Sequence, residues 1–277
     1  MKTLYFCWIA LIGFSACAST ETFSPAPDPV TEKPAGQGRS IEILCYNIHH
    51  CNPPSRPGVI DLESVARVIR DSGAEIVGLQ EVDVYTERSG KSLHMAKELA
   101  EMTGMDYYYF SKGIDYQGGE YGTAILSKYP LSDTTTLLLP AEEGTEQRTL
   151  SVATVTLDED TKIRFANTHL DYTSASNALS QAKKIISYFQ DKTLPAIMVG
   201  DFNSVPNSGP ILHLDGYFSR TCRNDCAPTS PADNPRKVID FIMYKGKDDF
   251  NVGLHQVIQE PYASDHLPVK ATLVLKE

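Results

Sequence analysis

Ala196-Ile197-Met198-Val199-Gly200-Asp201-Phe202-Asn203 is the stretch that decides how this chain folds. An apolar run followed by turn-forming residues is typical of a buried strand that ends in a loop. In an extended backbone Asp201 and Asn203 point to the same side. A carboxylate that only accepts hydrogen bonds then lies beside an amide that donates and accepts, and this pair can hold a water next to a phosphoryl oxygen. Taken alone, the stretch is better explained as a loop start in which Asp and Asn satisfy their own backbone.

The region near the start of the chain predicts a strand, a helix and a second strand. Residues 41–48 and 75–79 are apolar runs of strand length, and Asp61 between them is placed to cap a helix. This order and spacing imply two neighbouring parallel strands. Asn47 ends the first strand and Glu81 follows the second. We therefore expect both side chains at the same edge of one sheet.

The remaining elements follow from hydrophobic periodicity and turn residues. They are helices over residues 92–102 and 174–190 and strands over residues 106–110, 123–127, 134–139, 150–157, 162–167, 238–243 and 269–275. The short strands between residues 106 and 167 indicate an antiparallel meander. No internal repeat or linker divides the sequence after residue 39, so residues 39–277 are expected to form one domain.

Polar side chains gather where the predicted strands begin or end. They are Asn47, Glu81, His169, Asp201, Asn203, Asp240, Asp265 and His266. Layered α/β folds assemble their sites at such positions. Oxygen ligands combined with imidazoles suit Mg²⁺-assisted hydrolysis of a phosphate ester. Each residue considered singly also has an ordinary explanation, such as a satisfied strand end or a surface carboxylate.

Six short motifs carry these residues, in one order along the chain. They are Tyr46-Asn47-Ile48-His49, Leu79-Gln80-Glu81-Val82, Asn167-Thr168-His169-Leu170, Gly200-Asp201-Phe202-Asn203, Ile239-Asp240-Phe241-Ile242 and Ser264-Asp265-His266-Leu267-Pro268. Together they resemble the endonuclease/exonuclease/phosphatase superfamily, which has the deoxyribonuclease-I-like fold. The resemblance implies an α/β (α+β) four-layer sandwich, in which two mixed β-sheets pack face to face with helices outside.

The resemblance also implies a divalent metal. Glu81 would be the main Mg²⁺ ligand, helped by Asn47 and by Asp265, and Mn²⁺ is an alternative ion. This set fits the preference of Mg²⁺ for carboxylate and carbonyl oxygens. Whether one or two metals act is left open by the family's descriptions.

Five residues are implied to act on the phosphate itself. His266 would contact the scissile phosphate while Asp240 holds its ring and favours the charged imidazolium. Asp201 would position or deprotonate the attacking water, and Asn203 would orient the phosphate. His169 would donate to a non-bridging oxygen and stabilise developing negative charge.

Other polar residues near these motifs have ordinary structural explanations beside functional ones. His49 and His50 lie close to Asn47, but a supporting or structural role is expected rather than ligation. Tyr121 is explained equally well by a phosphate contact and by a gap filled between strands. Three basic residues are candidates for an anionic group of the substrate, although exposed basic residues are usually solvated surface; they are Arg88, Lys91 and Arg148.

The first residues have the composition of an export signal. Lys2 precedes an apolar run from Leu4 to Phe14, which is too short to span a bilayer, and small residues precede Cys17. Residues 1–16 are therefore predicted to be a signal peptide, and Cys17 to carry lipid as in a bacterial lipoprotein, although Phe14 stands where Leu is usual. An ordinary leader is the alternative. Pro-rich residues 17–38 predict a tether, which would place the protein in the cell envelope.

The charge of the chain bears on its substrate. Its formal charge is −10 at pH 7, and nucleic-acid affinity depends largely on Lys and Arg. A small, inositol-linked or lipid-linked phosphate ester is therefore favoured, with a secreted nuclease on DNA or RNA as the alternative. A non-catalytic binding protein on the same scaffold is the alternative of another class. We expect a monomer.

The cysteines after the leader allow one local disulfide. Cys222 and Cys226 share a polar, Pro-rich loop and could bridge if the envelope assignment holds, but the sequence does not decide whether they do. Zinc binding is disfavoured because no second close pair with matching histidines occurs. Cys45 lies in an apolar run and is expected to be a buried thiol.

Overall fold

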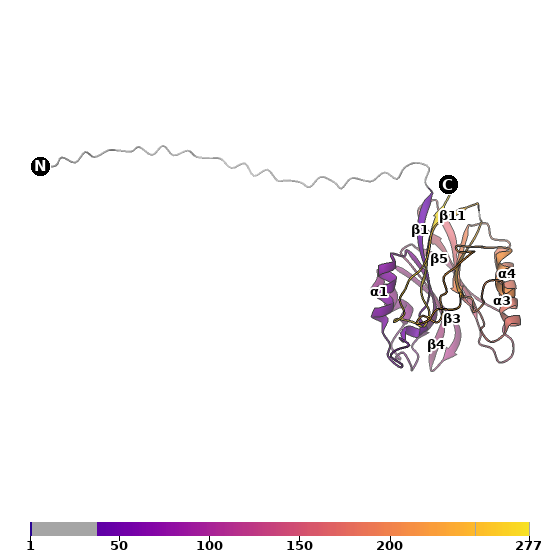
Figure 1. Cartoon of the computed structure of the whole chain (residues 1–277), viewed down its shortest axis with the longest axis horizontal. Coiled ribbons are helices and arrows are strands. Elements are labelled where there is room, and N and C mark those ends of the chain that lie inside the picture. Colours follow the sequence, from indigo (N-terminus) through magenta and orange to yellow (C-terminus); the bar gives the residue numbers. More distant parts are fainter. Residues whose placement is uncertain (2–37, 247, 277) are drawn as a thin grey trace. The chain divides into compact units, whose positions relative to one another are not determined.

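The computed structural model describes Met1, residues 38–246 and residues 248–276. The predicted leader after Met1, Cys17 and the tether up to residue 37 lie outside these residues. The folded unit consists of two six-stranded sheets flanked by helices (Figure 1). In the described residues no helix is long and apolar enough to cross a bilayer.

The first sheet has the strand order β11-β12-β1-β2-β4-β3. Its strands are β1 (Arg39–Asn47), β2 (Ile76–Val84), β3 (Tyr107–Tyr116), β4 (Gly119–Ser127), β11 (Phe250–Val257) and β12 (Val269–Leu275). β1 and β2 are parallel, and the other neighbours are antiparallel. The sheet is therefore mixed, and the predicted parallel pair is confirmed.

The second sheet has the order β5-β6-β7-β8-β10-β9. Its strands are β5 (Leu131–Leu138), β6 (Thr149–Thr156), β7 (Lys162–His169), β8 (Ala196–Asp201), β9 (Ser219–Arg220) and β10 (Asp240–Lys245). β7 and β8 are parallel at the centre, and the other neighbours are antiparallel. Each sheet thus has one central parallel pair, and each of these pairs is connected through a helix.

The helices begin and end where capping chemistry places them. They are α1 (Leu62–Ser72), α2 (Met95–Thr103), α3 (Ala175–Phe189), α4 (Gly209–Asp215) and a short 3₁₀ helix, η1 (His49–Cys51). The Asp61 carboxylate accepts a hydrogen bond from the backbone of Ser64, and Gly73 ends α1 with φ 68°. The Ser174 hydroxyl caps α3 in the same way.

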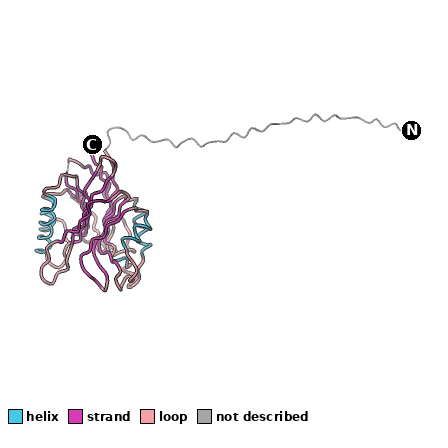
Figure 2. Tube along the Cα trace, turned by 180° about the vertical axis from the view of Figure 1, so that it is seen from behind, coloured by secondary structure: helices cyan, strands magenta, loops and turns pink. Residues whose placement is uncertain are grey.

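Three hydrophobic clusters define four layers. Along β1, Ile43 and Cys45 face the second sheet, whereas Leu44 and Tyr46 face α1 and α2, because successive strand residues point to opposite faces. α3 and α4 cover the outer face of the second sheet through a third cluster that includes Phe189. The helices accordingly lie on both flanks of the strands (Figure 2). The predicted four-layer sandwich is confirmed.

Two features differ from the sequence prediction. The run of antiparallel strands is not one meander, because the chain passes from β4 in the first sheet to β5 in the second. α4, β9 and β11 were not predicted. α4 begins in a Gly-Pro segment that reads as loop, and it is held by burial of Ile211 and Leu214 in the core.

At Gly78 the backbone of β2 lies very close to side chains of the second sheet. A Cβ atom at this position would lie 2.2 Å from Val199 Cγ2 and 3.0 Å from Asn167 Cγ. We predict that Gly78→Ala destabilises the fold by about 1–3 kcal/mol through overpacking. Gly253→Ala is the matched strand control, since its Cβ would make contacts no closer than 3.5 Å. Chemical denaturation of both variants measures the difference, and equal midpoints would contradict the close packing.

The structure contains the disulfide that the sequence allows and confirms the predicted buried thiol. Cys222 and Cys226 form a disulfide with a Cα–Cα distance of 5.8 Å. Cys45 is a buried free thiol, and Cys51 is a second one. The bridge lies in the loop between β9 and β10, so it pins a connection that has little regular structure.

Candidate active site

Pairing of β1 with β2 brings the first two candidate residues together. Asn47 is the register partner of Gln80 in this parallel pair. The Asn47 side-chain amide donates a hydrogen bond to Glu81 Oε1 at 3.0 Å. The expectation that Asn47 and Glu81 lie side by side is therefore confirmed.

Glu81 lies in a β-bulge. The register between β2 and β4 shifts between Leu79 and Val82, and Glu81 has φ 58°, which is uncommon for a residue with a side chain. The preceding Gln80 is buried and donates to Asn167 Oδ1 at 2.6 Å, across to the second sheet. Bulges commonly redirect a side chain next to a site. Here the bulge leaves Gln80 in the core and Glu81 partly exposed.

Pairing within the second sheet places three further residues in one row. His169 at the end of β7 is the partner of Asp201 at the end of β8. Asp240 at the start of β10 is the antiparallel partner of the same Asp201. Strand register alone therefore puts a carboxylate between an imidazole and a second carboxylate.

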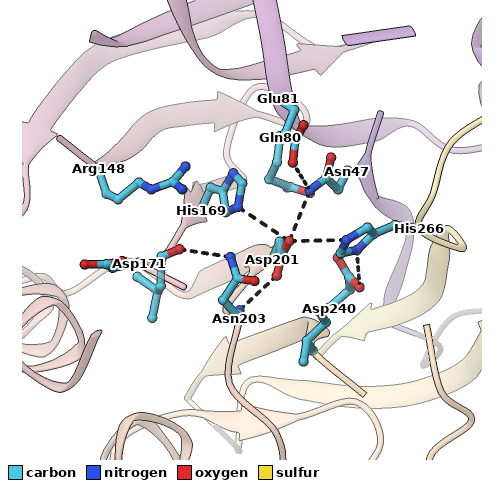
Figure 3. Close-up of polar contacts among 12 residues, drawn as sticks. Asn47, Gln80, Glu81, Arg148, His169, Asp171, Asp201, Asn203, Asp240 and His266 are labelled. Carbon is cyan, nitrogen blue, oxygen red and sulfur yellow. Dashed lines mark hydrogen bonds and ion pairs between the residues drawn. The ribbon is translucent and has the colours of Figure 1, made fainter. Parts of the chain in front are cut away.

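The Asp201 carboxylate is the centre of the site (Figure 3). Its Oδ2 accepts a hydrogen bond from the Asn47 amide at 3.0 Å, which links the two sheets. The Nε2 atoms of His169 and His266 lie 3.5 Å and 3.7 Å from the same oxygen. Asp201 is 1% exposed. Two imidazoles thus flank one buried carboxylate oxygen.

The charge states of these three side chains differ. Burial and the neighbouring Asp240 raise the pKa of Asp201 to about 7, against the opposing effect of His266. Burial would lower the pKa of His266, but Asp240 and Asp201 outweigh it and raise that pKa to about 10. Burial, Arg148 and His266 hold the pKa of His169 well below its usual range. At neutral pH His266 is an imidazolium and His169 a neutral ring.

Asp240 holds the His266 ring as the sequence predicts. Its Oδ2 lies 2.9 Å from His266 Nδ1. Because the ring is charged, Nδ1 donates this bond, and the Nε2 hydrogen is left for the centre of the site. The Thr229 hydroxyl also donates to Asp240 Oδ2. Thr229 was not singled out from the sequence, since no local pattern marks a threonine in a loop.

Asn203 differs from its prediction. The strand ends at Asp201, and Asn203 has φ 47°, so the backbone is not extended across the pair. The backbone N–H of Asn203 instead donates to Asp201 Oδ1 at 2.8 Å, and the Asn203 amide donates to the Leu170 carbonyl at 3.1 Å. The turn interpretation of this stretch is confirmed for Asp201 Oδ1, while Asp201 Oδ2 faces Asn47 and the two imidazoles.

Two clusters of side chains have the composition of metal sites. In each, the potential ligand atoms all lie within 4.8 Å of one another. One contains His49, His50 and Glu81, and the other contains Asp201, Asp240 and His266. Asp265 joins neither cluster among the residues that the structure describes; its carboxylate accepts a hydrogen bond from the Ser264 hydroxyl at 3.4 Å. Of the two predicted carboxylate ligands, Glu81 is thus the better placed. Asn47 turns its amide nitrogen toward Glu81 and Asp201, and its Oδ1 accepts a hydrogen bond from the His49 backbone.

Arg148 is a site residue that sequence reasoning left among surface cations. It is 5% exposed, and its guanidinium binds Glu146 at 2.9 Å. Its Nε atom is buried with no hydrogen-bond partner in the described residues. Arg148 and His169 line one pocket together with Tyr121, and Figure 3 shows the guanidinium beside the His169 ring. The apolar pattern of β6 gives no hint of this, because Arg148 directly precedes the strand.

Arg88, a second arginine near the site, is held in an ion pair with Asp83. Its guanidinium forms two hydrogen bonds with the buried Asp83 carboxylate, at 2.7 Å and 2.9 Å, and it lies over the Tyr116 ring. Burial, Arg88 and His49 together lower the pKa of His50 to about 4. Arg88 therefore lowers the pKa of His50 while it remains in an ion pair with Asp83.

The sequence profile of the Endonuclease/Exonuclease/phosphatase family matches residues 44–266 of this chain. That range contains every candidate site residue from Asn47 to His266. No curated protein sequence matches the chain significantly.

Known structures of similar fold carry the same architecture. An endonuclease/exonuclease/phosphatase from Beutenbergia cavernae has a TM-score of 0.75 at 23% identity, over 86% of this chain and 72% of that one. A mannosyl-6-phosphatase from Bacteroides thetaiotaomicron has a TM-score of 0.70 at 19% identity, over 85% and 100%. The human nocturnin catalytic domain, with bound sulfate, has a TM-score of 0.66 at 18% identity, over 87% and 97%. At these identities the likeness shows the shared fold.

Proposed function

The chain belongs to the endonuclease/exonuclease/phosphatase family, and on that premise we propose that it is a divalent-metal-dependent hydrolase of phosphate esters. One observation carries the proposal. Asp201 Oδ2 lies within 3.0–3.7 Å of Asn47 from one sheet and of two imidazoles, His169 and His266. A carboxylate that can accept a proton, flanked by nitrogen donors, suits attack of water on a phosphoryl group.

The residues present fit a hard divalent cation. Glu81 offers a partly exposed carboxylate. Asn47, whose amide nitrogen faces Glu81 and Asp201 in the structure, offers its Oδ1 to a cation there when the amide turns over. Both are ligand types that Mg²⁺ or Mn²⁺ takes while keeping several waters. When bound, the cation supplies neutralisation of the charge on the phosphoryl oxygens.

Three side chains of the protein act on the attacking water and on the phosphoryl group. Asp201 accepts a proton from the attacking water as the new P–O bond forms and the ester P–O bond breaks, and the departing alcohol takes its proton from solvent. The His266 imidazolium, held by Asp240, donates to a phosphoryl oxygen. His169 donates from a neutral ring. Preorganised donors of this kind are typically worth about 10²–10³ in rate each.

Arg148 is proposed to contact the anionic part of the substrate. Its buried Nε lacks a partner among the described residues, and an unsatisfied buried donor is costly. A phosphoryl oxygen in the pocket with His169 and Tyr121 would satisfy it. Burial and Glu81 raise the pKa of Tyr121, so its hydroxyl is a neutral hydrogen-bond donor.

A small or lipid-linked phosphate ester is the substrate class we favour. The chain has a formal charge of −10, and of the two arginines near the site Arg88 is already held by the buried Asp83, which leaves Arg148 to contact the substrate. A polyphosphate backbone needs accessible cations along its path. The fold neighbour described as a mannosyl-6-phosphatase supports a monoester of a small molecule.

Hydrolysis of a substrate panel tests the proposal. The panel contains bis-p-nitrophenyl phosphate, a hexose 6-phosphate, inositol phosphates, phospholipid vesicles and supercoiled plasmid, each with Mg²⁺, with Mn²⁺ and with a chelator. We expect metal-dependent turnover of a small or lipid-linked ester and intact plasmid at physiological salt. Plasmid nicking would favour the nuclease alternative. Binding of a phosphate ester with no turnover under either metal would favour a non-catalytic binding protein.

We also propose attachment of the chain to a membrane of the cell envelope through lipid on Cys17. The support is the sequence alone: the short apolar run that ends in small residues before Cys17, and the Pro-rich stretch after it. Attachment to this membrane would bring lipid-linked phosphates within reach of the candidate active site. Fractionation of cells that express the wild type or Cys17→Ser tests the anchor, and a variant that stays in the membrane fraction would contradict it.

A further inference from the structure

His49 and His50, which the proposed hydrolysis does not use, lie in a cluster with Glu81. The histidines form most of η1, immediately after β1, and Glu81 is the bulged residue of β2. Potential ligand atoms of all three lie within 4.8 Å of one another. The three residues are partly exposed, so an ion from solvent has access to them.

The hydrogen bond of His49 fixes which ring nitrogen is available. Its Nδ1 lies 2.9 Å from the backbone carbonyl oxygen of Asn52. A carbonyl only accepts, so Nδ1 carries the hydrogen and Nε2 keeps its lone pair. Metal-binding histidines are typically oriented in this way, with the second nitrogen donating to a carbonyl or carboxylate. The Asn52 amide is itself held by the carbonyls of Arg56 and Val59.

His50 has a ring nitrogen that no described residue satisfies. Its Nδ1 is buried and has no hydrogen-bond partner, although buried polar atoms are nearly always paired. The two rings contact edge to face with centroids 4.5 Å apart. This ring contact leaves His50 Nδ1 without a hydrogen-bond partner among the described residues.

The backbone that presents these ligands is strained. His49 and His50 have φ 44° and Glu81 has φ 58°, in the region that residues with a Cβ rarely adopt. Such conformations persist where the surrounding structure holds them, and they are concentrated at binding and catalytic sites. Here three residues in this conformation bring two imidazoles and a carboxylate within 4.8 Å of one another.

We propose that His49, His50 and Glu81 bind a transition-metal cation of the Zn²⁺ class, with Glu81 shared with the harder cation that Asn47 helps to hold. Imidazole nitrogen suits Zn²⁺, Cu²⁺, Ni²⁺ and Fe²⁺, whereas carboxylate, carbonyl and water oxygens suit Mg²⁺ and Mn²⁺. Two histidines and one carboxylate are also a ligand set of zinc sites that keep an open position. This inference rests on the proposed function only in sharing Glu81. The histidines, for which the sequence favours a supporting role, become ligands.

Co²⁺ titration of the substrate-free, full-length protein tests the site. We expect binding of about one equivalent that persists in excess Mg²⁺, with the visible d–d absorption of nitrogen-coordinated Co²⁺, and displacement by Zn²⁺. His49→Gln and His50→Gln should each weaken Co²⁺ binding by about tenfold or more, in line with losses seen when metal-site partners are removed. His213→Gln, at an exposed histidine of α4, is the matched control. Circular dichroism of each variant checks that it is folded.

The possible outcomes separate this inference from the proposed function. If excess Mg²⁺ removes all Co²⁺, or if neither histidine variant changes its affinity, the histidines pack against each other and the inference is wrong. If Glu81→Gln abolishes Co²⁺ binding while both histidine variants bind Co²⁺ as the wild type does, the ion occupies only the position shared with Asn47, which also overturns it. In both cases Mg²⁺-dependent ester hydrolysis would stand. Co²⁺ binding with no ester hydrolysis would overturn the proposed function and leave this inference intact.

Discussion

Asp201→Asn is expected to lower kcat for a phosphate ester by about 10²–10⁴-fold, the range typical of a general base. The Asp201 carboxylate lies within 3.0–3.7 Å of Asn47 and of both site imidazoles. An amide has nearly the same shape but cannot take a proton from water. Steady-state kinetics with the ester found in the substrate panel, at saturating Mg²⁺, measures the loss. KM should change much less than kcat.

The stability of this variant should fall only slightly. The amide keeps one of the two hydrogen bonds that the carboxylate accepts from Asn47 and Asn203, and a lost bond costs about 1–3 kcal/mol. Removal of a buried charge beside Asp240 offsets part of that cost. Asp160→Asn, at an exposed turn, is the control. A variant that is folded and retains more than a tenth of the wild-type kcat would remove Asp201 from the role of base.

Glu81→Gln is expected to reduce hydrolysis by at least about 10²-fold and to raise the Mg²⁺ concentration needed for half activity. The glutamine oxygen still accepts the hydrogen bond from Asn47 that is now 3.0 Å long, so the fold should be preserved. What is lost is the negative charge that attracts a divalent cation. Activity measured over a Mg²⁺ series, together with thermal unfolding with and without Mg²⁺, separates metal binding from folding.

Glu87→Gln is the matched control for this substitution. Glu87 lies just beyond β2, its side chain is 61% exposed, and it pairs with Lys91 on the surface. Exposed pairs of this kind contribute about 0–1 kcal/mol, so neither the Mg²⁺ series nor the unfolding midpoint should move. A loss below about tenfold for Glu81→Gln, equivalent to roughly 1.4 kcal/mol of barrier, would exclude Glu81 as the main ligand.

Local sequence predicted much of the fold because its signals are short in range. β12 has the predicted bounds, Asp61 and Gly73 delimit α1, and Ser174 caps α3. These features depend on apolar periodicity and on capping hydrogen bonds between residues a few positions apart. α4 escaped prediction because burial of two side chains, rather than local propensity, holds it in place.

For the site, sequence alone determined which residues stand at strand ends, and the parallel pairing of β1 with β2 followed from the helix between them. Tertiary structure decided the rest. Packing of one sheet on the other brings Asn47 within 3.0 Å of Asp201, 154 positions away. Strand pairing within each sheet brings Arg148, just before β6, near His169 of β7, and brings His49 and His50, just after β1, near Glu81 of β2. The physical reason is that periodicity and spacing report contacts along one strand or helix, whereas side-chain contacts between sheets depend on how whole layers of the core fit together.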